Sequence, residues 1–301
     1  MRIRSHVRPI YNKTSKYLLS LTNDNSGIRI LDEEWDTLII LDCARFDIFN
    51  NVNNLPGSLR KVRSRASATG EFIRQNFEQR KAHDLVYLSA NPTVGKLSNL
   101  IDIYKIVGVW GPPRTKRGQE SKRGLVDPGP VIERSRDLHN EFPNKRHIVH
   151  LLPPHVPHRF KDGRELPQES LYRNYDAARE GLITASDMKS VYSENLDMII
   201  NELDTLLNQI DGKVVVTADH GELLGEGMPL WMKLIHHRWG NRLANYDFGH
   251  YPTVDVPELR DVPWLEYPHK NRRTIVEDVP QESEFDDISI RDNLSALGYV
   301  N

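Results

Sequence analysis

Residues that could carry out acid–base or metal chemistry stand directly after three short apolar runs. Asp42 follows T-L-I-I-L, Asp219 and His220 follow K-V-V-V-T-A, and His155 follows H-I-V-H-L-L-P-P. An acid after a buried strand is commonly a helix cap, and a lone histidine in a loop is commonly solvated. Because carboxylate and imidazole groups are ligands for divalent cations, their joint occurrence at three strand ends favours a metal site.

The elements that must position these residues alternate along the chain. Short apolar runs predict five buried strands, at residues 37–41, 84–88, 104–110, 147–152 and 213–218. Helical periodicity lies between them, at residues 70–77, 131–140 and 187–210. This order predicts a three-layer α/β/α sandwich with a mostly parallel central sheet. Because ligands bind at the carboxyl ends of strands in such sheets, we expect the strand-end residues to converge.

Four segments together resemble the alkaline phosphatase superfamily, which includes sulfatases, phosphodiesterases, phosphopentomutases and lipid phosphoglycerol transferases. W-D-T-L-I-I-L-D-C-A-R-F-D (35–47) is similar to the opening strand of that superfamily, where the acid that ends the strand binds metal. H-L-L-P-P-H-V-P-H (150–158) resembles its histidine-proline segment, V-V-V-T-A-D-H-G-E-L-L-G-E-G (214–227) its Asp-His-Gly segment, and Y-D-F-G-H (246–250) its late Gly-His. The segments follow the family order, so the resemblance implies an alkaline phosphatase-like fold.

The resemblance also implies the ligands of a divalent ion. Asp42, Asp219 and His220 would surround one ion, zinc or manganese. His155 and His250 would bind phosphoryl oxygens or, if a second ion enters, become its ligands. We assign His250 to the metal. We assign His155 to the substrate, because the middle segment has histidines but no acid and is more similar to the one-metal branch, where that histidine contacts the substrate phosphate.

A nucleophile is expected at the start of the helix after the first strand, within S-R-A-S-A-T-G-E (64–71). The resemblance selects Ser67 from its spacing to Gly70, and Thr69 is the alternative because its hydroxyl could equally face the metal. Either residue could instead only cap the helix. A divalent ion would lower the pKa of the hydroxyl, and the helix N-terminus would favour an incoming anion.

Two further residues lie just past strand ends on the same predicted edge. Arg45 and Asn91 could donate hydrogen bonds to a phosphate group. Arg45 could instead pair with Asp47, two residues along the chain.

These features predict a metal-dependent phosphate-ester hydrolase or phosphotransferase that uses a serine or threonine phospho-enzyme intermediate. A sulfatase-like sulfuric-ester hydrolase is an alternative, but residues 67–71 lack the Pro and Arg of the motif that is matured to formylglycine. A non-catalytic binding protein that retains the fold is another alternative. That alternative predicts the loss of a ligand, whereas every candidate residue is present.

Composition limits the remaining possibilities. The 301 residues carry a net charge of -2, which disfavours a nucleic-acid partner, and the single cysteine excludes a disulfide framework. We expect a basic arm (1–34), a catalytic domain (35–270) with excursions near 111–130 and 226–249, and a C-terminal extension (271–301). Without a membrane-spanning run or signal segment, we expect a cytoplasmic protein. Its substrate is expected to be a phosphate ester that could be glycan- or lipid-linked, and the arm could touch membrane surfaces weakly.

Overall fold

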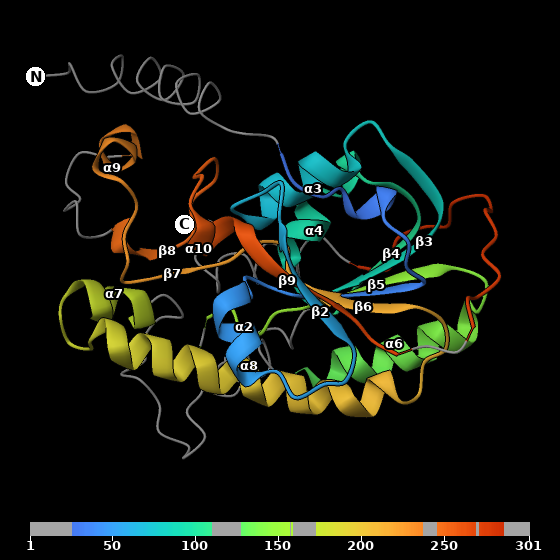
Figure 1. Cartoon of the computed structure of the whole chain (residues 1–301). Coiled ribbons are helices and arrows are strands. Elements are labelled where there is room, and N and C mark those ends of the chain that lie inside the picture. Colours follow the sequence, from blue (N-terminus) through green and yellow to red (C-terminus); the bar gives the residue numbers. More distant parts are fainter. Residues whose placement is uncertain are drawn as a thin grey trace, which may run out of the picture.

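A seven-stranded sheet forms the centre of the computed structural model, which describes residues 26–109, 128–156, 158, 173–236, 246–268 and 271–285. The strand order is β2-β9-β6-β1-β5-β3-β4 (Figure 1). In chain order the strands are β1 (Thr37–Leu41), β2 (Ser58–Arg63), β3 (Lys81–Ser89), β4 (Asp102–Gly108), β5 (Arg146–Leu151), β6 (Val214–Thr217) and β9 (Asp261–Glu266). Strand β9 runs antiparallel to both of its neighbours, β2 and β6, whereas the other paired strands are parallel, so the predicted mostly parallel sheet is confirmed.

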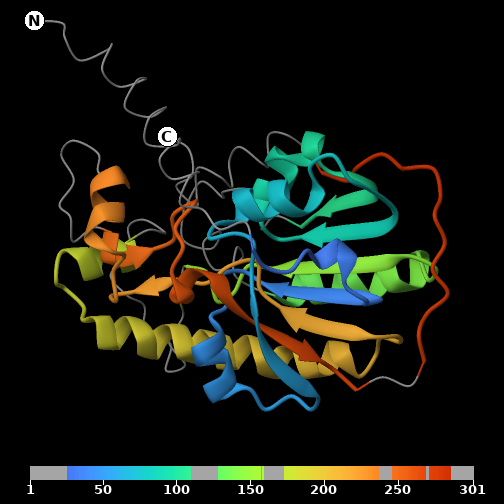
Figure 2. The ribbon, with the colours of Figure 1, turned by 45° about the horizontal axis from the view of Figure 1, so that its top comes forward.

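Helices cover both faces of this sheet, which completes the predicted three layers. The helices of the described residues are η1 (Ile30–Asp32), α2 (Phe46–Val52), α3 (Thr69–Phe77), α4 (Pro92–Lys96), η2 (Ser98–Leu100), α6 (Gly129–Glu141), α7 (Arg173–Arg179), α8 (Ala185–Leu207), α9 (Leu230–His236) and α10 (Pro257–Arg260). Helices α3 and α4 lie on one face, and α2, α6 and α8 lie on the other (Figures 1 and 2). A separate two-stranded sheet joins β7 (Leu223–Leu224) to β8 (Phe248–Gly249).

Strand β1 lies in the middle of the core. Its five residues, T-L-I-I-L, are all buried, and it pairs in parallel with β5 and β6. A strand that is covered on both faces has no solvent side, so its sequence is a continuous apolar run rather than an alternating one. All five runs that predict strands lie on strands of this sheet.

Helix α8 is the longest helix of the described residues and covers one face of the sheet. It begins at a capping box, in which Thr184 and Asp187 each bind the backbone amide of the other. Its apolar residues at spacings of three and four, such as Tyr192, Leu196 and Ile199, are buried. The helix ends at Leu207, three residues before the predicted end.

The edge formed by β2 and β9 is not predicted by the sequence pattern. Strand β2 buries only Val62 of its six residues, so its sequence, S-L-R-K-V-R, has no continuous apolar run. Strand β9 contains Pro263, which lacks a backbone donor and argues against a strand within a sheet.

Several expectations fall on parts of the chain that are not described. Most of the excursion near 111–130, the later part of the C-terminal extension (286–301) and most of the predicted arm lie outside the described residues. The described end of that arm packs against the domain, because Ile30 is buried and its amide donates to Asn76. Within the described segments, no helix combines the length and the apolar character needed to cross a membrane.

Candidate functional site

The register of the parallel strands brings two acids together at one edge of the sheet. Ile40 of β1 lies opposite His150 of β5 on one side and opposite Thr217 of β6 on the other. Residues opposite one another in a parallel sheet point to the same face, and the side-chain direction repeats every two residues. Asp42 and Asp219 therefore lie on the face of His150, each two residues beyond the level of Ile40.

Each of the two carboxylates has one oxygen held by the protein and one oxygen left over. Asn91 Nδ2 donates to Asp42 Oδ2 (2.5 Å), while the backbone amides of Cys43 (3.0 Å) and His220 (2.9 Å) donate to Asp219 Oδ1. Asp42 Oδ1 and Asp219 Oδ2 are buried, and neither has a hydrogen-bond partner among the described residues. Such oxygens are costly to bury unless a cation or another donor binds them.

His150 completes this arrangement from the neighbouring strand. Tyr87 Oη lies 3.0 Å from its Nδ1, and its Nε2 has no hydrogen-bond partner in the described part of the chain. This Nε2 lies 3.6 Å from Asp42 Oδ2 and 4.0 Å from Asp219 Oδ2. One donor atom from each of the three residues lies within 4.8 Å of the others. A divalent ion bound at about 2.0–2.2 Å from each donor requires separations of this order, so the three residues fit a metal.

His220 offers a fourth donor at the same point. Its Nδ1 lies 2.8 Å from the carbonyl oxygen of Gly221, so Nδ1 carries the proton and Nε2 carries a lone pair. Nε2 lies 3.3 Å from Asp219 Oδ2 and 3.8 Å from Asp42 Oδ1. All four donors are fully buried, as expected for a site that excludes water from the ion.

The charges of this cluster alter the pKa values of its members. Burial opposes the charged form of Asp42, but the neighbouring imidazoles of His150, His155 and His220 outweigh it, so the pKa of Asp42 lies well below its ordinary value. Burial also lowers the pKa of His220, against the opposing effect of Asp219. Ionised carboxylates and neutral imidazoles are the forms that bind metals.

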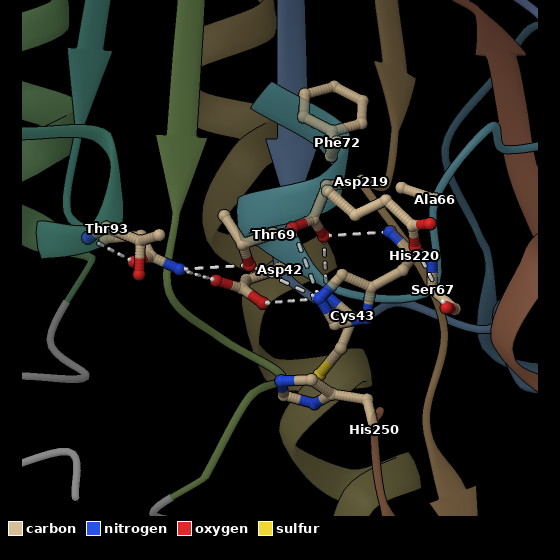
Figure 3. Close-up of polar contacts among 12 residues, drawn as sticks. Asp42, Cys43, Ala66, Ser67, Thr69, Phe72, Thr93, Asp219, His220 and His250 are labelled. Carbon is tan, nitrogen blue, oxygen red and sulfur yellow. Dashed lines mark hydrogen bonds and ion pairs between the residues drawn. The ribbon is translucent and has the colours of Figure 1, made fainter. Parts of the chain in front are cut away.

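Thr69 is the hydroxyl that faces this cluster (Figure 3). It is the first residue of α3, and its Oγ1 lies 3.3 Å from His220 Nε2 and 3.3 Å from Asn91 Nδ2. Asn91 is itself held by its cap on α4, because its Oδ1 accepts from the Thr93 amide (2.8 Å). The same amide group therefore binds Asp42 and Thr69, which fixes the hydroxyl beside the carboxylate.

Ser67, which the resemblance selects as the nucleophile, lies away from this cluster. Its Oγ donates to the carbonyl oxygen of Tyr251 (2.8 Å) and accepts from the amide of Val254 (3.0 Å), and Glu71 lies 3.1 Å away. Figure 3 draws its side chain on the side of His220 away from Asp42. Thr69 begins α3, whereas Ser67 precedes the N-cap Ala68 and bonds to the backbone of the 251–254 loop. The structure therefore brings Thr69, and not Ser67, to the cluster.

Arg45 makes contacts that leave it little role in phosphate binding. Its guanidinium pairs with Asp47 (2.7 Å) and Glu226 (2.8 Å) and donates to the carbonyl oxygen of Glu222 (3.1 Å). Of the two roles expected for Arg45, the structure shows the pairing with Asp47.

His155 and His250 lie together on another side of the cluster. The ring centroid of His250 is 4.4 Å from that of His220 and 5.4 Å from that of His155. Its Nδ1 lies 3.1 Å from the buried carboxylate of Glu222. Burial would lower the pKa of His250, but Glu222 reverses this effect and raises that pKa to about 9. The pKa of Glu222 falls to about 2 because the charge of His250 outweighs the cost of burial.

Two residues of the site are absent from the sequence-based assignment. His150 lies inside an apolar run, where a histidine is indistinguishable from a core residue until the register is known. Glu222 stands within the Asp-His-Gly segment, directly after Gly221, and only its position beside Asp219 and His220 in the sequence hints at a role.

The fold and the site together define an α/β sandwich protein with a candidate divalent-metal centre and a helix-borne hydroxyl at the carboxyl edge of its sheet. No family model matches the chain. A low-salt glycan biosynthesis sulfotransferase from Haloferax volcanii is 31% identical over 124 residues, which cover 39% of this chain and only 25% of that protein.

Solved structures give weaker similarities. The lipooligosaccharide phosphoethanolamine transferase A of Neisseria meningitidis, an integral membrane protein, matches with a TM-score of 0.48 and 12% identity, over 88% of this chain and 55% of that one. The periplasmic domain of a phosphoethanolamine transferase from Campylobacter jejuni matches with a TM-score of 0.41 and 16% identity, over 77% and 78%. The chain thus spans about half the length of the first of these proteins, and scores below 0.5 do not establish a family.

Proposed function

We propose that this chain is a metal-dependent phosphate-ester hydrolase or phosphotransferase of the alkaline phosphatase type, with Thr69 as its nucleophile. The observation that carries the proposal is the position of the Thr69 hydroxyl, 3.3 Å from His220 Nε2, beside the buried donors of Asp42, His150 and Asp219. A hydroxyl is a poor nucleophile at neutral pH, and a neighbouring divalent ion is one of the means by which proteins activate it.

The proposed reaction proceeds in two displacements. Thr69 Oγ1 attacks phosphorus in line, the bond from phosphorus to the leaving alcohol breaks, and a phosphothreonine forms. Water or an acceptor alcohol then attacks the phosphothreonine and releases Thr69. When bound, the divalent ion would supply positive charge that stabilises the ionised hydroxyl and the phosphoryl oxygens.

The residues of the chain have separate roles in this proposal. Asp42, His150, Asp219 and His220 would hold the ion, for which zinc and manganese both suit the oxygen and nitrogen donors. Asn91 orients Thr69. His155 and His250 are the candidates for binding the phosphoryl oxygens, and the amides at the start of α3 favour the incoming anion.

Sulfuryl-ester chemistry is the second candidate. It is favoured by the partial match to a protein named as a glycan biosynthesis sulfotransferase. Sulfate and phosphate monoesters are both tetrahedral anions, so one site of this kind could act on either. A glycan- or lipid-linked ester is the proposed natural substrate in both cases.

The experiment compares Thr69→Ala with Ser67→Ala in assays with an aryl phosphate and an aryl sulfate, together with elemental analysis of each protein. We expect Thr69→Ala to lower kcat by at least about 10³-fold with metal retained, Thr69→Ser to keep measurable turnover, and Ser67→Ala to keep most of it. Faster turnover of the sulfate ester would favour the second candidate. Bound metal without turnover of either ester would favour the non-catalytic alternative, and loss of activity in Ser67→Ala alone would contradict the assignment of Thr69.

A further inference from the structure

Glu222 is a fully buried acid at the candidate site that the proposed reaction does not yet use. Its relative exposure is 0%, and both of its carboxylate oxygens lie close to His250 Nδ1, at 3.1 and 3.2 Å. A buried carboxylate is unfavourable unless a donor binds it. His250 supplies such a donor, and the two residues form a carboxylate–histidine pair.

The small second sheet produces this pair. Leu223 of β7 lies opposite Gly249 of β8 in an antiparallel register. Glu222 precedes Leu223 and His250 follows Gly249, so the two side chains come from adjacent positions across the two strands. Glu222 also directly follows Gly221 of the Asp-His-Gly segment, so the same short sheet connects His250 to the segment that contains Asp219 and His220.

The pair determines which nitrogen of His250 is free. A carboxylate accepts hydrogen bonds only, so Nδ1 must carry a proton, and Nε2 is the nitrogen left for another partner. The ring stands 4.4 Å from the ring of His220, centroid to centroid, and 5.4 Å from the ring of His155. Glu222 therefore binds one nitrogen of His250, while the ring lies beside His220 and His155 of the site.

We infer that Glu222 is a positioning residue that orients His250, so that its Nε2 is presented to the phosphoryl group of the substrate. The identity of the substrate in this inference rests on the proposed function, whereas the geometry of the Glu222–His250 pair is independent of it. Glu222 then acts through His250 and binds neither substrate nor metal. Carboxylates that orient a functional histidine in this way affect activity by about 10- to 100-fold when they are replaced.

The test compares Glu222→Gln with Glu226→Gln, a matched control four residues along the same segment. Glu226 pairs with Arg45 (2.8 Å) and Lys189 (2.9 Å), outside the metal cluster. We expect Glu222→Gln to lower kcat for an aryl phosphate by about 10- to 100-fold, with little change in KM and unchanged metal content, and Glu226→Gln to leave kcat within about twofold. An unchanged kcat in Glu222→Gln, or a loss that is fully explained by lost metal, would overturn the inference.

A second measurement does not depend on turnover. Long-range ¹H–¹⁵N spectra report which imidazole nitrogen carries the proton, and the His250 signals are assigned by their loss in His250→Gln. We expect a protonated Nδ1 in the wild-type protein, with Nε2 also protonated at pH values below the raised pKa of His250, and a partial loss of the Nδ1 proton in Glu222→Gln. A wild-type His250 with unprotonated Nδ1 overturns the inference even if the protein is an active phosphoesterase. The expected spectra in a protein without turnover would refute the proposed function and leave the pairing intact.

Discussion

Two stacked histidines between α6 and β5 make the stability of the fold depend on pH. The rings of His139 and His147 lie 4.0 Å apart, centroid to centroid, with an angle of 18° between their planes. His139 Nδ1 donates to the carbonyl oxygen of Ser135 (2.7 Å), and its Nε2 accepts from the hydroxyl of Thr37 (2.9 Å). His147 Nε2 donates to the carbonyl oxygen of Phe142 (3.0 Å). In the neutral form, both ring nitrogens of His139 are therefore bonded, and Nε2 of His147 donates its hydrogen bond.

Burial lowers the pKa of His139 from 6.5 to about 4, and it lowers the pKa of His147 as well, with the charge of His139 as a further cause. Between these pH values the unfolded chain binds a proton at His139 and the folded chain does not. The free energy of unfolding therefore falls as the pH drops from 6.5 towards 4. At about 1.4 kcal/mol per pH unit, His139 alone accounts for a loss of about 2 kcal/mol between pH 6.5 and pH 5.

The assay is urea denaturation of the wild-type protein and of His139→Gln at pH 7.5 and pH 5. Glutamine has both a donor and an acceptor but does not titrate, so the variant keeps the bonding capacity and loses the protonation. We expect the variant to be the less stable protein at pH 7.5, because the ring stacking is lost. Between the two pH values the wild-type protein should lose about 2 kcal/mol more than the variant. Equal losses in the two proteins would refute the reasoning, because they would mean that His139 does not resist protonation in the fold.

Two further substitutions test the positioning of the site. Asn91→Ala removes the donor to Asp42 and Thr69 together with the cap of α4. We expect kcat for an aryl phosphate to fall by about 10-fold and the free energy of unfolding by about 1 kcal/mol, and a kcat equal to that of the wild type would contradict the role of Asn91. Gly221→Ala adds a Cβ only 2.1 Å from the backbone oxygen of Glu258, so the segment must move. We expect urea denaturation to show a free energy of unfolding lower by about 1–3 kcal/mol and metal titration to show weaker binding. Wild-type values for both would argue against close packing between Gly221 and the backbone of Glu258.

The sequence pattern was sufficient for most of the sheet and for part of the site. Continuous apolar runs predict the strands that are covered on both faces, and the acids after two of those runs lie together as expected. The β2–β9 edge was missed because its strands are exposed or contain a proline. Arg45 and Ser67 were assigned from their positions near strand and helix ends, which does not reveal the carboxylates and backbone groups that bind them in the folded chain.

By itself, the sequence determined the layered architecture and the carboxyl edge at which Asp42, Asp219 and His220 meet, because local apolar runs decide where buried strands form and end. Only the tertiary structure decided that His150 joins them, that Thr69 rather than Ser67 faces them, and that Glu222 holds His250. These choices depend on strand register and on the direction of a side chain over a shift of one or two residues. Contacts between distant segments set both quantities, and no local pattern of residues contains them.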